Sequence, residues 1–205
     1  MDPQSRIAEL EGELKIQQDL VESLRHDTVS GLLGRRSFED VLKALFSPRR
    51  ADDGHVGIIM VDIDHFKLVN DEHGHRVGDE VIAQVAKAIK ACVRTSDTVA
   101  RYGGEEYVCV LARASVSGLA LLSERIRAAV EKMEHPGCPK VTISVGFSIQ
   151  HFSDTDPMEI VERADQALYV AKHQGRNQVG HETLGYAELA LIEKIDRLRR
   201  EEVTP

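Results

Sequence analysis

Apolar residues recur with a heptad period over the first 25 residues of the chain. The repeat is formed by Ile7, Leu10, Leu14, Gln17, Val21 and Leu24. This spacing predicts a helix, which either packs as an amphipathic helix on its own domain or pairs with a second copy as a short coiled coil. The polar residue within the seam and the charged side chains around the helix favour the coiled coil, and with it a homodimer.

An unbroken apolar run from Val56 to Val61 is typical of a central strand that is covered on both faces. The pattern further predicts helices over 38–45, 79–92, 116–133 and 157–174, and strands over 98–102, 107–111 and 140–150. The two glycines between the strands over 98–102 and 107–111 predict a hairpin. This order resembles a split βαβ sheet with helices on one face, so we expect an α+β fold.

Composition indicates one principal domain with short appendages. The chain has 205 residues, of which 42% are apolar, and it can bury one core but hardly two. We expect a coiled-coil signalling helix over residues 1–26, the main domain over 27–180, and a charged helix or tail over 181–205.

Charge, apolar runs and cysteines exclude several classes of protein. A net charge of −8 argues against nucleic acid as a partner and against attraction to an anionic membrane. We find no apolar run long enough to cross a bilayer and no signal-peptide core, so we expect no membrane insertion. The three cysteines are far apart and form no CxxC pair, which favours reduced thiols and a cytoplasmic location. Because the chain is acidic overall, an anionic ligand would have to be bound by metal ions or by a few positively charged side chains in its site.

The stretch "RYGGEEYVCVL" places two glycines and two glutamates within an apolar run. Gly103 and Gly104 would let the backbone approach a bulky ligand closely, while Glu105 and Glu106 hold carboxylates at the hairpin tip. Asp62, at the end of the neighbouring strand, could converge on the same place. Such oxygen ligands suit Mg²⁺ or Mn²⁺ and phosphate chemistry. Taken alone, the tetrapeptide is more typical of a solvated hairpin, so the interpretation depends on further motifs.

Those motifs resemble one known family. "RYGGEEY", "VDIDHFKLVND", "HGHRVGDEV", "SVGFS" and "ADQALYVAKHQGRN" occur in the order and at the spacing of the GGDEF domain of bacterial diguanylate cyclases. The resemblance covers roughly Asp27 to Asn177. It implies a palm-type antiparallel sheet flanked by helices, related to nucleotidyl cyclases. It also implies a reaction in which two GTP condense into cyclic di-GMP and release two pyrophosphates.

The resemblance implies a metal site with two Mg²⁺ or Mn²⁺ ions per GTP. Its ligands would be Asp62, the carbonyl of Ile63 and Glu105, with Asp64 nearby. Glu106 would either bind metal or help accept the proton of the attacking 3′-hydroxyl. The proton acceptor stays open, because metal activation alone can acidify the hydroxyl without a dedicated base.

The resemblance also implies the residues that bind GTP. Backbone groups of the turn at Phe66 and Lys67 would cradle phosphate oxygens, with the Phe66 side chain itself in the core. Asn70 and Asp79 would read the guanine edge, and Asp79 is equally interpreted as a helix cap. On the helix over 157–174 and just beyond it, Lys172 and Arg176 would contact the γ- and β-phosphates; without the resemblance they would be assigned to a solvated face.

The string "RTSD" resembles the inhibitory RxxD site of the family. Arg94 and Asp97 would bind the product cyclic di-GMP, since an arginine fork and a carboxylate complement the guanine edge. Arg125 is a weaker candidate for the same site. The alternative is a surface ion pair between Arg94 and Asp97, because RxxD alone is a common string.

The chain departs from the family pattern at a few positions. Tyr107 replaces phenylalanine in the signature, so its hydroxyl needs a partner if it is buried. In the opening motif, Ser30 replaces threonine and Gly34 replaces asparagine, and we expect Gly34 to supply a left-handed backbone conformation. His73 and His75 match a structural turn of the family rather than a zinc site.

Three functional hypotheses follow. The leading one is a diguanylate cyclase that acts as a dimer, because one site holds one GTP and the bond forms between two nucleotides. The second is a non-catalytic module that senses GTP or cyclic di-GMP, which ranks lower because the signature acids are present. A hybrid enzyme that makes mixed cyclic dinucleotides is disfavoured by Asp79.

Overall fold

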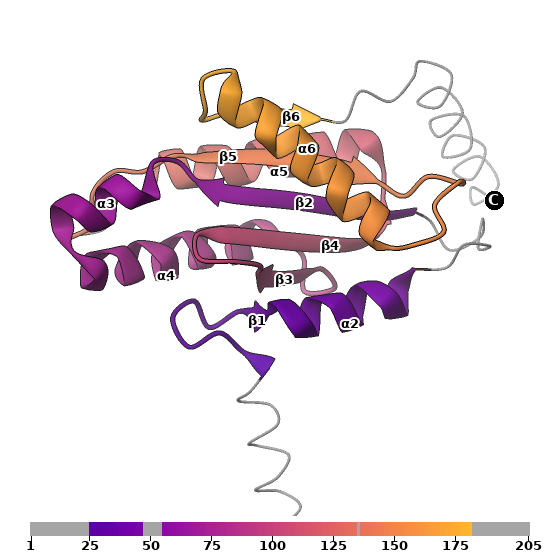
Figure 1. Cartoon of the computed structure of the whole chain (residues 1–205), viewed down its shortest axis with the longest axis horizontal. Helices are drawn as coiled ribbons and strands as arrows, with labels where there is room; N and C mark the ends of the chain where they lie inside the picture. The colour runs from indigo at the N-terminus through magenta and orange to yellow at the C-terminus, as the bar shows by residue number, and fades with distance from the viewer. Residues whose placement is uncertain (1–24, 47–54, 135, 182–205) are drawn as a thin grey trace, which may run out of the picture.

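The computed structural model describes residues 25–46, 55–134 and 136–181, which form one six-stranded sheet flanked by helices (Figure 1). In order across the sheet, the strands are β1 (Leu33–Gly34), β3 (Thr98–Arg101), β4 (Glu106–Ala114), β2 (His55–Ile63), β5 (Ile143–Ile149) and β6 (Val179–His181). The predicted coiled coil over 1–26, apart from its last two residues, and the predicted C-terminal helix lie outside the described residues.

The middle of the sheet is antiparallel and its two edges are parallel. β2 pairs antiparallel with both β4 and β5, whereas β1 pairs parallel with β3 and β6 parallel with β5. All nine residues of β2 are buried, which confirms the central strand predicted from the apolar run. The hairpin between β3 and β4 is also confirmed. The fold is the expected α+β fold with an antiparallel centre.

Helices cover both faces of the sheet rather than one. Their bounds are α2 (Arg35–Leu45), α3 (Phe66–His73), α4 (His75–Cys92), α5 (Val116–Glu131) and α6 (Met158–His173). Alternate residues of β2 enter two separate cores: Ile59 and Val61 pack with α4 and α5, whereas Ile58 and Met60 pack with α2 and α6. The expectation of helices on one face was therefore wrong. A strand that is apolar on both faces needs cover on both.

The segment between β2 and β3 holds two helices where a turn and one helix were expected. α4 begins at His75, and Gly74, with φ of +80°, separates it from α3. The turn predicted at the two histidines is therefore present. Asp79 lies inside α4 and is not its N-cap, so that interpretation was wrong. With only eight residues, α3 is too short for its periodicity to be distinctive.

Close packing of α6 on the sheet explains where its last turn lies. A side chain at Gly146 of β5 would overlap the backbone of Ala164 and Leu168 in α6, so only glycine allows this approach. The helix consequently runs directly over β5 and carries Lys172 to the carboxyl end of β2. None of the helices in the described ranges is long and apolar enough to cross a membrane.

Candidate active site

Asp62 is the acidic residue at the centre of the site. It is the penultimate residue of β2, it is 7% exposed, and it lies opposite Glu106 of β4 in the sheet register. Burial raises the pKa of Asp62 from 3.8 to about 6; Lys172 opposes this increase, and the negative charges of Glu105 and Glu106 add to it. The protein thus maintains a carboxylate at a place where burial and like charges both disfavour its ionised form.

Lys172 of α6 is the counter-ion of that carboxylate. Its Nζ lies 2.8 Å from Asp62 Oδ2, and the side chains of Lys172 and Asp62 are 29% and 10% exposed. An ion pair this shielded from water is stronger than a surface pair, because solvent screens it less. The structure therefore brings a predicted phosphate-binding cation into direct contact with a predicted metal ligand.

The signature turn is fixed to the end of β2 by backbone hydrogen bonds. The N–H groups of Tyr102 and Gly103 both donate to the carbonyl of Glu106, over 2.8 and 3.3 Å, and Ile63 N donates to the carbonyl of Glu105 over 3.3 Å. A Cβ atom at Gly103 would overlap the Glu106 carboxylate, whereas a Cβ at Gly104 would meet nothing within 4 Å. The backbone at Gly104 is thus open to a ligand.

Arg101 connects the signature turn to the start of the domain. Its Nε and Nη2 donate to the carbonyl of Gly104 over 3.0 and 2.6 Å, and its Nη1 lies 2.9 Å from both carboxylate oxygens of Asp27. Burial acts to raise the pKa of Asp27, but hydrogen bonds from Ser30 and the pairing with Arg101 lower it below its usual value. No sequence pattern links the two residues of this pair, because they are 74 positions apart.

The guanine-reading candidates lie together on α3 and α4. Asn70 Oδ1 is so close to Gly78 that a Cβ atom there would overlap it, which places the Asn70 side chain beside the residue that precedes Asp79. Asp79 is exposed. Phe66 is 7% exposed and belongs to the core beneath α4, as expected, while Lys67 beside it is exposed.

Among the described residues, no three His, Cys, Asp or Glu side chains form a group that could hold a metal ion. The candidate oxygen donors are the carboxylates of Asp62, Glu105 and Glu106 and the Ile63 carbonyl. The negative charges of Glu105 and Glu106 raise the pKa of Asp62, so the three carboxylates repel one another in this part of the site. This excess of negative charge, together with hard oxygen donors, fits a divalent cation.

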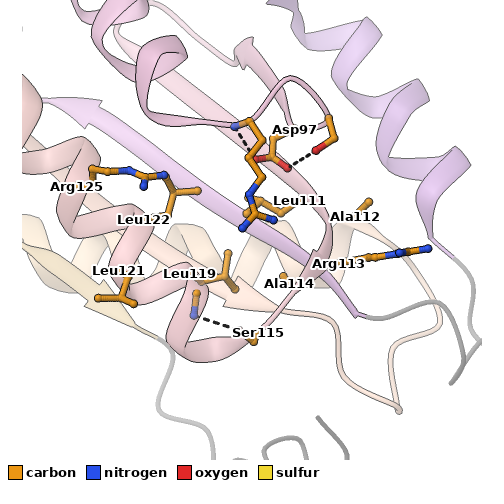
Figure 2. Close-up of a pocket in the computed structure, with 13 residues that line it drawn as sticks. Asp97, Leu111, Ala112, Arg113, Ala114, Ser115, Leu119, Leu121, Leu122 and Arg125 are labelled. Atoms are coloured by element: carbon orange, nitrogen blue, oxygen red, sulfur yellow. Dashed lines mark hydrogen bonds between the residues drawn. The ribbon is translucent and has the colours of Figure 1, made fainter. Parts of the chain in front are cut away.

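A pocket on the surface formed with α5 contains all three residues of the predicted inhibitory site. It has a volume of about 540 Å³, and Arg94, Asp97 and Arg125 line it together with residues of β4 and α5 (Figure 2). The Asp97 carboxylate accepts from the backbone N–H of Arg94 over 3.0 Å rather than from its guanidinium. Within the described part of the chain, the surface ion pair between Arg94 and Asp97 is therefore not formed. The pocket contacts β4 near Ala114, at the opposite end of the strand from Glu106.

Most of the chain matches one known protein family. The family described as "Diguanylate cyclase, GGDEF domain" matches residues 24–178. This chain belongs to the GGDEF family.

Similar proteins include enzymes and a solved complex. Over 127 residues, the chain is 48% identical to diguanylate cyclase A of Treponema denticola, covering 60% of this chain and 34% of that protein. It is 36% identical over 165 residues to diguanylate cyclase DgcM of Escherichia coli, covering 80% and 40%. The coiled coil and GGDEF domain of DgcB from Caulobacter crescentus, in complex with c-di-GMP, aligns with a TM-score of 0.76 and 30% identity, covering 87% of this chain and 98% of that one. The chain thus spans 34–40% of the length of these two curated relatives.

Two departures of this GGDEF domain from its family pattern are explained by the structure. Tyr107 is completely buried and its hydroxyl donates to the Ile82 carbonyl over 2.9 Å, so the additional polar group is satisfied. Gly34 is extended, with φ of −82°, because it pairs with Arg101 in the sheet; the expectation of a left-handed conformation there was wrong. The left-handed glycine of the opening motif is Gly31, with φ of +68°.

Proposed function

We propose that this chain is a diguanylate cyclase that condenses two GTP into cyclic di-GMP and releases two pyrophosphates. The observation that carries the proposal is the buried Asp62 carboxylate, held beside the glycine-rich turn and the two signature glutamates, with Lys172 as counter-ion. Membership of the GGDEF family and the two relatives named as diguanylate cyclases support it.

In this proposal each group has a distinct task. Asn70 and Asp79 bind the guanine edge, because an amide and a carboxylate complement its acceptor and donors. The open backbone at Gly104 lets the nucleotide lie against the turn, and Gly103 leaves room there for the Glu106 carboxylate. The phosphates are bound by the start of α3 at Phe66 and Lys67, and by Lys172 and Arg176.

Asp62, the Ile63 carbonyl, Glu105 and Glu106 would hold two Mg²⁺ or Mn²⁺ ions. When bound, such ions stabilise charge on the reacting phosphates and acidify the attacking 3′-hydroxyl. Glu106 lies opposite Asp62 in the sheet register, and in this proposal it either binds metal or helps to accept the released proton.

The reaction requires a homodimer in this proposal, because each domain binds one GTP and the new ester joins two nucleotides. A coiled coil over residues 1–26 would raise the local concentration of the second domain. Product inhibition is assigned to the pocket of Arg94, Asp97 and Arg125, where the Arg94 guanidinium is not engaged by Asp97. The pocket lies at the end of β4 near Ala114, whereas Glu106, opposite Asp62, lies at the other end, as expected for a regulatory site separate from the active site.

Turnover measured against protein concentration tests the proposal. With GTP and Mg²⁺, we expect cyclic di-GMP and a specific activity that rises with protein concentration. Removing residues 1–25 should shift this rise to higher concentration. Absence of cyclic di-GMP at every concentration, while the protein binds cyclic di-GMP in calorimetry, would instead identify a non-catalytic sensor. Competition of ATP with GTP distinguishes the hybrid enzyme.

A further inference from the structure

Asp64 is a buried acid beside the active site that serves no function in the mechanism above. It follows β2 directly, it is 5% exposed, and both of its oxygens accept hydrogen bonds. Ser144 Oγ donates to Oδ1 over 2.6 Å, and Oδ2 accepts from Thr142 Oγ1 over 2.7 Å and from the backbone N–H of Asn177 over 3.0 Å. A buried carboxylate with three donors is strongly oriented.

The last of these donors belongs to a turn with unfavourable backbone geometry. Arg176 and Asn177, between α6 and β6, have φ of 63° and 44°, and two successive non-glycine residues in this region need support from their surroundings. The turn carries Arg176, which is exposed and whose guanidinium forms no ion pair or hydrogen bond with another described residue.

Helix α5 holds the other side of the same turn. Arg127 Nη1 donates to Asn177 Oδ1 over 2.7 Å, and Asn177 Nδ2 donates to Glu131 Oε1 over 2.7 Å. The side chain of Asn177 is therefore fixed by α5, whereas its backbone is fixed by Asp64. Of these two anchors, only Asp64 connects the turn to the strand that carries Asp62.

We propose that Asp64 is a positioning residue, which holds the turn at Arg176 and Asn177 against the end of β2 so that Arg176 faces the nucleotide phosphates. The assignment of Arg176 to phosphate rests on the proposed function. Asp64 acts through hydrogen bonds and not through a bound metal ion. A neutral group of the same shape is therefore expected to replace it.

Two substitutions distinguish a role of Asp64 through hydrogen bonds from a role as a metal ligand. Asp64→Asn can retain an oxygen facing Thr142 and Asn177 while its amide faces the Ser144 hydroxyl, which can accept a hydrogen bond. Asp64→Ala removes every acceptor. In the full chain with Mg²⁺, binding is compared for GMP and for a GTP analogue with a methylene bridge between the α- and β-phosphorus, which cannot react.

We expect Asp64→Ala to weaken binding of the triphosphate analogue roughly tenfold and to change GMP binding less than about twofold, because the phosphate contact loses its support. Asp64→Asn should stay within about threefold of the natural chain for both ligands. Titration of Mn²⁺ without nucleotide should give the same affinity for all three proteins. A loss of Mn²⁺ binding in Asp64→Asn, or equal losses of both nucleotides in Asp64→Ala, would overturn the proposal.

Hydrogen exchange at the Asn177 amide gives a readout that does not depend on nucleotide chemistry. The exchange should accelerate in Asp64→Ala and stay slow in Asp64→Asn, and unchanged exchange in both overturns the assignment. If Asp64→Ala does not fold, the variant Thr142→Val removes one orienting donor, and it should accelerate the same amide to a smaller extent. A natural chain that binds no triphosphate would contradict the proposed function, while the exchange result would still decide whether Asp64 holds the turn.

Discussion

Lys172 Nζ of α6 forms an ion pair with Asp62 Oδ2 of β2 over 2.8 Å. Asp62 is a proposed metal ligand and Lys172 a proposed phosphate ligand, so the two cannot remain paired in the same way once GTP and metal are bound. The positive charge of Lys172 partly neutralises the carboxylates of Asp62, Glu105 and Glu106 in this site. Binding of metal and nucleotide then requires that Lys172 exchange a carboxylate for a phosphate.

Lys172→Met should therefore bind Mn²⁺ several-fold more tightly than the natural chain when nucleotide is absent. The substitution removes both the competing partner of Asp62 and a positive charge near the metal site. The measurement is a calorimetric Mn²⁺ titration at pH 8, where Asp62 is ionised, and the same variant should bind GTP more weakly. The matched control is Lys87→Met, an exposed lysine of α4, which should change neither affinity. Weaker Mn²⁺ binding in Lys172→Met would contradict this exchange.

Asp62 should make the folded protein less stable as the pH rises. Its pKa is about 6 in the folded protein against an ordinary value of 3.8, so folding favours the protonated acid. This contribution is fully present below pH 3.8 and is lost as the pH rises through about 6, at an order-of-magnitude cost of roughly 3 kcal/mol at neutral pH. Asp62→Asn should match the natural chain near pH 4 and exceed its free energy of unfolding at pH 8. Urea unfolding at both values checks this, and equal stability at pH 8 would refute it.

Gly103→Ala and Gly104→Ala should both fold but lose activity for different reasons. At position 103 the new methyl group displaces the Glu106 carboxylate, whereas at position 104 it meets nothing in the protein and obstructs only a bound nucleotide. Each should lower kcat/KM more than about tenfold, with the larger rise in KM for Gly104→Ala. Thermal unfolding provides the control, since neither variant should lose much stability. Full activity of Gly104→Ala would show that GTP does not approach the turn there.

Asp27 and Arg101 should be strongly coupled, because Arg101 also holds the Gly104 carbonyl. A double-mutant cycle with Asp27→Asn and Arg101→Lys should give a coupling free energy of about 1–2 kcal/mol, since lysine cannot reproduce the forked contacts. The exposed pair of Arg35 and Glu39 is the comparison, with an expected coupling below about 0.5 kcal/mol. Similar coupling in both pairs would contradict a special role for Arg101.

Arg94→Ala should weaken cyclic di-GMP binding about ten- to a hundredfold, the effect of losing a forked contact to guanine. Calorimetry with cyclic di-GMP measures it directly. Arg113→Ala is the control from the same pocket, because Arg113 is directed away from Asp97 (Figure 2). Equal effects of the two substitutions would indicate that the pocket attracts the ligand by charge alone.

Local sequence patterns predicted the fold well where one periodicity dominated. The apolar run of β2 identified the central strand, and the glycines between β3 and β4 identified the hairpin. Two local predictions failed: Asp79, which was also assigned to the guanine edge, is not a helix cap, and Gly34 does not adopt a left-handed conformation. Gly34 is extended because it pairs with Arg101 in the sheet. Asp79 is not a cap because α4 begins earlier, at His75.

By itself, the sequence determined the family, the order of the four central strands and of every helix except α3, and the chemical types at the site, because apolar period and motif spacing are local properties. Only the tertiary structure decided which charges meet. Lys172 reaches Asp62 because glycine lets α6 lie directly on β5, Asp27 meets Arg101 across 74 positions, and Asp64 meets Asn177 across 113. Contacts between residues so distant in the chain depend on how helices pack on the sheet, and spacing along the sequence does not encode that geometry.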